Sequence, residues 1–223
     1  MSEKEIKRIK CPKCGALHDF EIWVRINTDL DPVLGKKVKS GELFRTTCPF
    51  CGQKIDVVYP CLYHEMENKV MIFYAPGAQA MKDAEAAFDE GSEEAARERG
   101  FDPAQRGYRN RVVGSLYDLQ EKIAIFDAGL DDRVVEICKV MVGSELQQSQ
   151  PQAEFDDLLF YKDSTGWRLA LMKNGNAFAS VALPPEIYTA VGDHYKPLID
   201  RFGDEKVIDM DWVMNSVNRA EEK

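Results

Sequence analysis

The sequence predicts an α+β protein with three parts, namely an N-terminal antiparallel β lobe, a central pair of helices and a small C-terminal α+β lobe. Residues 19–27 alternate between polar and apolar side chains, which is typical of a half-buried strand. Residues 112–141 repeat apolar side chains at helical spacing, and strand patterns return after residue 151. With 223 residues the chain fits two domains, which we place at residues 1–145 and 151–223.

The composition is that of a globular protein, with 44% hydrophobic and 30% charged residues. The sequence has no run of about 18 apolar residues and no apolar core of a secretory signal, so we expect a cytoplasmic protein without a membrane span. Its net charge is −9, and residues 76–223 carry 17 basic against 28 acidic side chains. Nucleic acid is therefore an unfavoured partner, because a large nucleic-acid interface needs a basic face.

The N-terminal lobe is expected to be a small antiparallel sheet. After the strand at residues 19–27, Asp31, Pro32 and Gly35 break the pattern, and "GKKVKSGE" is expected to be an exposed loop. Strands are expected around "ELFRTT", "KIDVVYP" and "KVMIFYA", because β-branched and aromatic residues favour strands. Residues 76–107 are predicted to be a semi-ordered connector, in which "AQAMKDAEAAFDE" can form a helix.

Two cysteine pairs in this lobe share the local sequence Cys-Pro-x-Cys-Gly. Their members are Cys11, Cys14, Cys48 and Cys51. Two residues between paired cysteines let both sulfurs turn to one point, and zinc takes four thiolates at about 2.3 Å in a tetrahedron. Pro12 and Pro49 preset the backbone, and Gly15 and Gly52 stand where the chain needs a positive φ.

Paired cysteines in a reducing compartment indicate a metal site before they indicate disulfides. Three other interpretations stay open: a redox pair of thioredoxin type, an iron site of rubredoxin type, and reduced cysteines without a metal. Two glycine-terminated pairs favour zinc. Because four protein ligands leave no position for water, we expect a structural Zn²⁺ that holds a zinc-ribbon-like lobe.

The central helices follow from apolar spacing. The first helix is expected to carry one stripe formed by Val112, Leu116, Leu119, Ile123 and Phe126. Gly129 can end this helix, and Asp131 or Asp132 can cap the next one. The second apolar face is formed by Val134, Ile137, Cys138 and Met141. We expect Cys138 to be a buried core thiol, and "GSELQQSQPQ" to be a linker.

The C-terminal lobe is expected to begin with three strands, "DLLFYKD", "WRLALMK" and "AFASVAL", joined by hairpin turns. A helix follows Pro184 and Pro185, with a kink or break at Pro197. Residues 206–220 are predicted to form a short strand followed by a helix that is capped near Asp211.

The two knuckles "CPKCG" and "CPFCG", with "IWVRINTDLDPVLGKKVKSGELFRTT" between them and "VVYPCLYHE" after them, resemble the CpXC-domain family of bacterial proteins. The resemblance covers roughly residues 8–140, including "EKIAIFDAGLDDRVVEICK" in the helical region. It implies that the metal ligands are Cys11, Cys14, Cys48 and Cys51. It implies no catalytic residue, and it says little about residues 151–223.

Other residues with ligand or acid–base chemistry have ordinary structural explanations. Cys61 and His64 are unnecessary once four thiolates fill a site, and His18 is expected to be exposed at a strand start. The acidic group consists of Glu121, Asp131, Asp132 and Glu136. Helix capping explains its aspartates, and an ion pair with Lys139 or Arg133 explains Glu136.

The favoured function is a non-catalytic protein-interaction or regulatory module with a structural zinc site and a protein partner. The first alternative is an enzyme with a cleft lined by Glu121, Asp131 or Glu136, whose carboxylates would converge and have raised pKa values. The second is a weak nucleic-acid binder that uses a basic loop. That loop would contain Lys36, Lys37 and Lys39, followed by Phe44 and Arg45.

Overall fold

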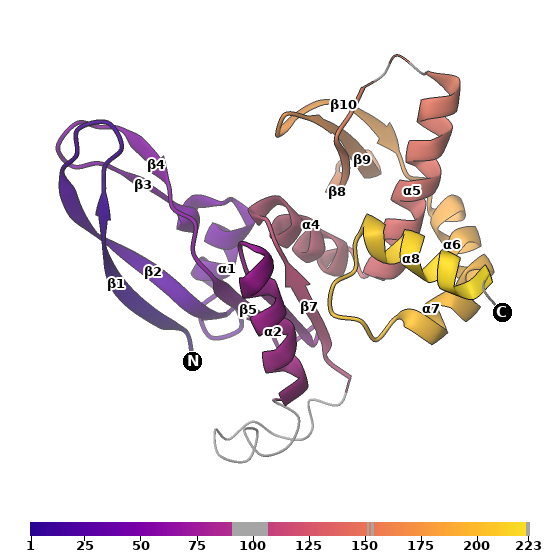
Figure 1. Ribbon diagram of the computed structural model, residues 1–223, viewed down its shortest axis with the longest axis horizontal. Coiled ribbons are helices and arrows are strands. Elements are labelled where there is room, and N and C mark those ends of the chain that lie inside the picture. The colour runs from indigo at the N-terminus through magenta and orange to yellow at the C-terminus, as the bar shows by residue number, and fades with distance from the viewer. Residues whose placement is uncertain (91–106, 151, 153, 222–223) are drawn as a thin grey trace. The chain divides into compact units, whose positions relative to one another are not determined.

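The computed structural model describes residues 1–90, 107–150, 152 and 154–221 (Figure 1). The chain forms two compact units, Met1–Gln120 and Glu121–Lys223. Each unit contains helices and strands, so the predicted α+β class is confirmed. The domain limits at 1–145 and 151–223 concern independent folding and stay a prediction. None of the helices in the described part of the chain is long and apolar enough to cross a membrane.

A five-stranded sheet with the order β1-β2-β5-β6-β7 forms the centre of the first unit. Its strands are β1 (Glu3–Lys10), β2 (Leu17–Asn27), β5 (Cys61–Glu65), β6 (Val70–Tyr74) and β7 (Arg109–Val113). The pairs β1–β2 and β5–β6 are antiparallel, as expected for this lobe. The pairs β2–β5 and β6–β7 are parallel, so the sheet as a whole is mixed.

Three of these strands were not predicted from the sequence, namely β1, β5 and β7, and Val112 of β7 was assigned to a helix instead. Strand β1 is exposed along most of its length, and its charged side chains suit an edge strand that must not pair with other chains. Strand β5 alternates correctly, because Cys61 and Tyr63 are buried, but it is too short to stand out beside Pro60. Strand β2 was predicted, and its Ile22 and Ile26 are buried as its alternation requires.

The predicted loop "GKKVKSGE" is wrong in its first half, because residues Pro32–Lys39 form helix α1. Pro32 starts the helix, where its missing N–H costs nothing, and Val38 is fully buried. The amide of Gln120 closes the other end by donating a hydrogen bond of 2.9 Å to the carbonyl of Lys39. Three lysines in the last turn stabilise the negative end of the helix dipole.

The chain then forms a short 3₁₀ turn, η1 (Glu42–Phe44), and a separate two-stranded hairpin of β3 (Arg45–Thr47) and β4 (Lys54–Asp56). Part of the predicted connector is helix α2 (Ala78–Glu90), which packs on β7. The rest of that connector, residues 91–106, lies outside the described residues.

Helix α4 (Leu116–Asp127) contains four of the five predicted stripe residues, whereas Val112 lies in β7. The helix starts later than predicted because Ser115 and Asp118 exchange hydrogen bonds of 3.1 Å between side chain and backbone, which forms a capping box. Gly129 has a φ of 73° and ends the helix as expected.

Helix α5 (Asp132–Ser149) is capped by Asp131, whose carboxylate accepts a hydrogen bond of 3.0 Å from the backbone N–H of Arg133. The predicted linker at "GSELQQSQPQ" is wrong up to Ser149, because α5 continues through it. Its Gly143 is buried, and a Cβ at this position would make only ordinary contacts of 3.6 Å with Leu158 and 3.8 Å with Phe155.

The remainder of the second unit is a sheet with the order β10-β9-β8 and three helices. The elements are β8 (Asp157–Asp163), β9 (Gly166–Lys173), β10 (Asn176–Ala182), α6 (Pro185–His194), α7 (Lys196–Phe202) and α8 (Met210–Glu221). The predicted hairpins and the break near Pro197 are confirmed. The short strand predicted before the last helix is wrong, and Asp209 rather than Asp211 caps α8 by accepting from the N–H of Trp212 at 2.8 Å.

Candidate metal centre

Each cysteine pair lies at the turn of a β-hairpin, and both turns have the same backbone geometry. The carbonyl of Cys11 accepts from Gly15 at 3.0 Å, and the carbonyl of Cys48 accepts from Gly52 at 3.0 Å. Gly15 and Gly52 have φ values of 74° and 71°, the left-handed region that glycine adopts without steric cost. The repeated Cys-Pro-x-Cys-Gly sequence therefore encodes the same knuckle twice.

The two hairpins β1–β2 and β3–β4 bring their knuckles together at one end of the first unit (Figure 1). The Sγ atoms of Cys11 and Cys51 are 3.7 Å apart, and those of Cys14 and Cys48 are also 3.7 Å apart. All four Sγ atoms lie within 4.8 Å of one another. Among the described residues they form the one group of three or more side chains so arranged that they could hold a metal ion.

The sulfur separations fit a tetrahedral metal site. Four thiolates at about 2.3 Å from one ion have sulfur atoms about 3.8 Å apart. The observed separations of 3.7 Å agree with this value, whereas a disulfide would need about 2.05 Å. All the cysteines are free thiols. The donor set and its dimensions therefore fit a four-coordinate ion.

The electrostatics of Cys11 and Cys51 are also compatible with a bound cation. The backbone N–H of Cys14 is the largest influence that lowers the pKa of Cys11, to about 6. For Cys51 the N–H of Gln53 acts in the same direction, but burial and the neighbouring thiols outweigh it and raise the pKa to about 12. Cys51 thus resists ionising beside its neighbours, and a divalent cation would offset that cost.

The remaining cysteines and histidines lie apart from this cluster. Cys61 is fully buried in β5, and burial raises its pKa to about 12. The imidazole of His64 makes a 3.1 Å hydrogen bond to the hydroxyl of Tyr108. Cys138 is fully buried, as predicted. His18 is half-buried rather than exposed, with its Nδ1 3.3 Å from the carbonyl of Asp19.

The basic group that suggested nucleic-acid binding is not a loop. Its lysines lie on helix α1, and Lys37 pairs with Glu42 at 3.4 Å. The ring of Phe44 is 2% exposed and packs between the rings of Tyr59 and Tyr74. A ring that is buried in the core cannot stack on a base.

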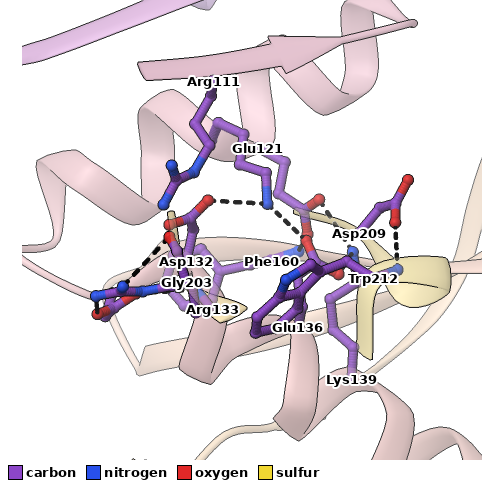
Figure 2. A network of polar contacts seen from close by, with 12 residues as sticks. Arg111, Glu121, Asp132, Arg133, Glu136, Lys139, Phe160, Gly203, Asp209 and Trp212 are labelled. Carbon is purple, nitrogen blue, oxygen red and sulfur yellow. Dashed lines mark hydrogen bonds and ion pairs between the residues drawn. The ribbon is translucent and has the colours of Figure 1, made fainter. Parts of the chain in front are cut away.

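Part of the predicted acidic group converges, but it does so inside the second unit (Figure 2). Glu121 and Glu136 are 4% and 2% exposed. Oε2 of Glu121 accepts a hydrogen bond of 3.1 Å from Lys139, and Oε2 of Glu136 forms an ion pair of 3.0 Å with the same ammonium group. Asp131 lies outside this network and pairs with the guanidinium of Arg133. Burial keeps both glutamates away from any substrate in solution.

Sequence reasoning named Lys139 as a partner of Glu136, but it missed Lys122 and the burial of both lysines. Lys122 and Lys139 are 3% and 4% exposed, although lysine is rarely so deeply buried without a charged partner. A pattern that could have revealed the burial of Lys122 is the apolar character of α4 on more than one face, since Ile125 is buried together with Leu119 and Ile123. A helix that is buried on more than one face also buries charges that lie on those faces.

Comparison with known proteins identifies the family. The sequence model of the CpXC protein family matches residues 9–139, which include both knuckles and both helices of the buried network up to Lys139. The chain has no significant match among the curated proteins or among the solved structures. The matched segment covers more than half of the 223 residues. The chain therefore belongs to the CpXC protein family.

Proposed function

We propose that this protein is a cytoplasmic, non-catalytic interaction module in which a structural zinc ion locks two hairpins together. The ligands would be Cys11, Cys14, Cys48 and Cys51. The observation that supports this most directly is the convergence of the four Sγ atoms within 4.8 Å. Four thiolates complete the tetrahedral shell of zinc and leave no position for water or substrate, so such a site stabilises the fold.

Zinc has a clear structural task at this position. The hairpin β3–β4 has only three residues in each strand, and it pairs with no other strand of the described chain. A two-stranded hairpin of this length is marginal in water. Thiolates from both hairpins would fasten β3–β4 to β1–β2 through the ion. Free thiols are also what a reducing cytoplasm maintains.

The proposed interaction role is supported by exposed apolar side chains at the second knuckle and just after its hairpin. Phe50 stands between the two cysteines of the second knuckle, and its ring is 68% exposed. A large aromatic side chain fixed at a rigid, exposed tip is a common anchor for a protein partner. Val58, which follows the same hairpin, is 67% exposed. We therefore expect the zinc-bound hairpins to present this tip to a protein.

Native mass spectrometry and absorbance test the metal. We expect a single zinc ion per chain and a colourless protein, because zinc has no visible transitions whereas a rubredoxin-type iron site is strongly coloured. Protein that is purified under reducing conditions without metal, or with stoichiometric iron, would refute the zinc assignment. A mass two hydrogens lower per cysteine pair would identify disulfides instead.

Site-specific crosslinking in cells tests the interaction role. A photoreactive phenylalanine analogue at position 50 should form a discrete protein adduct. The same analogue at Val33, which is 64% exposed on α1, is the matched control and should form none. The adduct at position 50 should also disappear when Cys14 is changed to Ser. Equal crosslinking at both positions, or none at position 50, contradicts an interaction through this tip.

A further inference from the structure

Helices α4 and α5 bury a group of charged side chains that the zinc module does not use (Figure 2). We call it the charged cluster, and its members are Glu121, Lys122, Asp132, Glu136 and Lys139. None of them is more than 4% exposed. Strand β8 closes over the group, because the backbone N–H of Phe160 donates a hydrogen bond to Oε1 of Glu121.

The two lysines are shared unequally among the acids. Lys122 Nζ lies 2.9 Å from Oε1 of Glu136 and 3.3 Å from Oδ2 of Asp132. Lys139 Nζ lies 3.0 Å from Oε2 of Glu136 and 3.1 Å from Oε2 of Glu121. Glu136 thus contacts both ammonium groups, whereas Glu121 contacts one that it must share.

The arrangement of two buried carboxylates around the ammonium group of Lys139 points to a bound proton. Oε2 of Glu136 is buried and accepts no hydrogen bond, although it is close to Lys139. Two buried carboxylates around one ammonium are stabilised when one of them is protonated, because this removes their repulsion and the cost of burying a second charge.

Further acidic side chains near the charged cluster also favour protonation of one carboxylate. Asp157 on β8 interacts electrostatically with Lys139, and Asp209, just before α8, adds negative charge near Glu136 and Lys122. Although burial opposes it, Lys122 and Lys139 hold the pKa of Glu136 below its usual value. Burial raises the pKa of Glu121 to about 7. Glu136 contacts both ammonium groups and Glu121 contacts only one, so Glu121 is the acid of the pair that takes the proton.

We propose that Glu121 is a buried proton-binding site, which is protonated while β8 packs on α4 and α5 and ionises when that packing loosens. Phe160 and Asp209 lie beyond the family match, which ends at residue 139. The part of the chain outside that match therefore completes the site. Because this part of the chain packs over Glu121, its packing on α4 and α5 becomes sensitive to pH near neutrality.

The unmodified, zinc-loaded chain can be titrated directly by NMR. We would follow the side-chain carboxyl carbons of Glu121 and Glu136 and the amide nitrogen of Phe160 from pH 4 to 9. The expected result is a midpoint near 7 for Glu121, with the Phe160 amide changing at the same midpoint because it donates to that carboxylate.

Two results would overturn the proposal. One is a midpoint for Glu121 at or below its ordinary value of 4.5. The other is a neutral-range midpoint that belongs to Glu136 instead. Glu121→Gln is the assignment control, and it should abolish the transition at Phe160. If that variant fails to fold, the unmodified chain still tests the proposal. The midpoints of Glu121 and the Phe160 amide must then agree, and a disagreement between them contradicts it.

Discussion

Cys11 and Cys51 stand 40 positions apart in the sequence, yet their Sγ atoms are 3.7 Å apart. The separation is close to the sulfur–sulfur edge of a zinc tetrahedron, about 3.8 Å. Neither hairpin could set this distance alone, because each contributes one cysteine to the contact. The junction between the hairpins is therefore where the loss of a ligand should be most visible.

Cys14→Ser should abolish stoichiometric zinc. Removing an inner thiolate should reduce zinc affinity by at least about 100-fold, since changes to outer partners of metal ligands alone cost about 10–100-fold. Metal content and a competition titration with a chromogenic chelator measure this. Cys138→Ala is the matched control, because Cys138 is fully buried in α5 and outside the cluster. It should cost about 1–2 kcal/mol of stability and retain zinc; zinc loss in both variants would argue against a defined site.

Chelation should loosen the two hairpins and leave the second unit intact. Without the ion, β3–β4 has three residues per strand and no other strand to pair with in the described chain. Hydrogen exchange after zinc removal should therefore accelerate at Arg45–Thr47 and Lys54–Asp56. The amides of β8, β9 and β10 serve as the internal control and should keep their protection. Unchanged exchange in the hairpins would mean that the fold does not depend on the metal.

Substitution of a knuckle glycine should destabilise the fold through its backbone conformation alone. Gly52 has a φ of 71°, and a Cβ there would meet nothing within 4 Å. Gly52→Ala should therefore cost about 1–2 kcal/mol from left-handed strain, without a clash. Gly192→Ala is a useful comparison, because this helical glycine has ordinary contacts of 3.5 Å to Val134 and should gain stability from the added helix propensity. Thermal unfolding of both variants with zinc bound checks the opposite signs.

The metal cluster could be predicted from the sequence because a knuckle is local. Its turn is encoded within five residues, and a second copy supplies the remaining ligands. The α+β class was predictable for a similar reason, since the patterns of β2 and α5 are strong. Helix α1 was not, because its lysines and Gly35 resemble a loop until Gly35 is seen against Thr28, 3.0 Å from the position of a Cβ.

The charged cluster was hidden from the sequence by distance. Glu121 and Lys139 are 18 positions apart, and the sequence pattern does not show that these two side chains meet. Their burial depends on β8, which begins at Asp157, and on the segment before α8. Glu136 and Lys139 were expected to pair at helical spacing, and they do, at 3.0 Å. That the pair is buried depends on tertiary packing, which the helical pattern does not encode.

Because Glu121 holds a proton in the folded protein, the second unit should become less stable as the pH rises. Between pH 4.5 and about 7 the folded state holds a proton at Glu121 that the unfolded chain has released. The unfolding constant of the unmodified protein should therefore increase by up to about tenfold per pH unit, relative to Glu121→Gln, which cannot ionise. The lowered pKa of Glu136 affects the stability of the fold only below this pH window. The stabilisation that ionised Glu136 contributes is fully present above pH 4.5 and is lost at lower pH.

The comparison with Glu121→Gln is needed because the first unit titrates in the same range with the opposite sign. Burial lowers the pKa of His64, so its unfolded form binds a proton below about 6.5 and its contribution to stability grows as the pH rises. Both proteins share this effect, and it cancels in the difference. Glu145→Gln removes an exposed carboxylate from the same helix as Glu136 and should follow the unmodified protein. Denaturant unfolding at pH 5, 6, 7 and 8 checks this, and a parallel course of all three proteins would show that no proton is bound at Glu121.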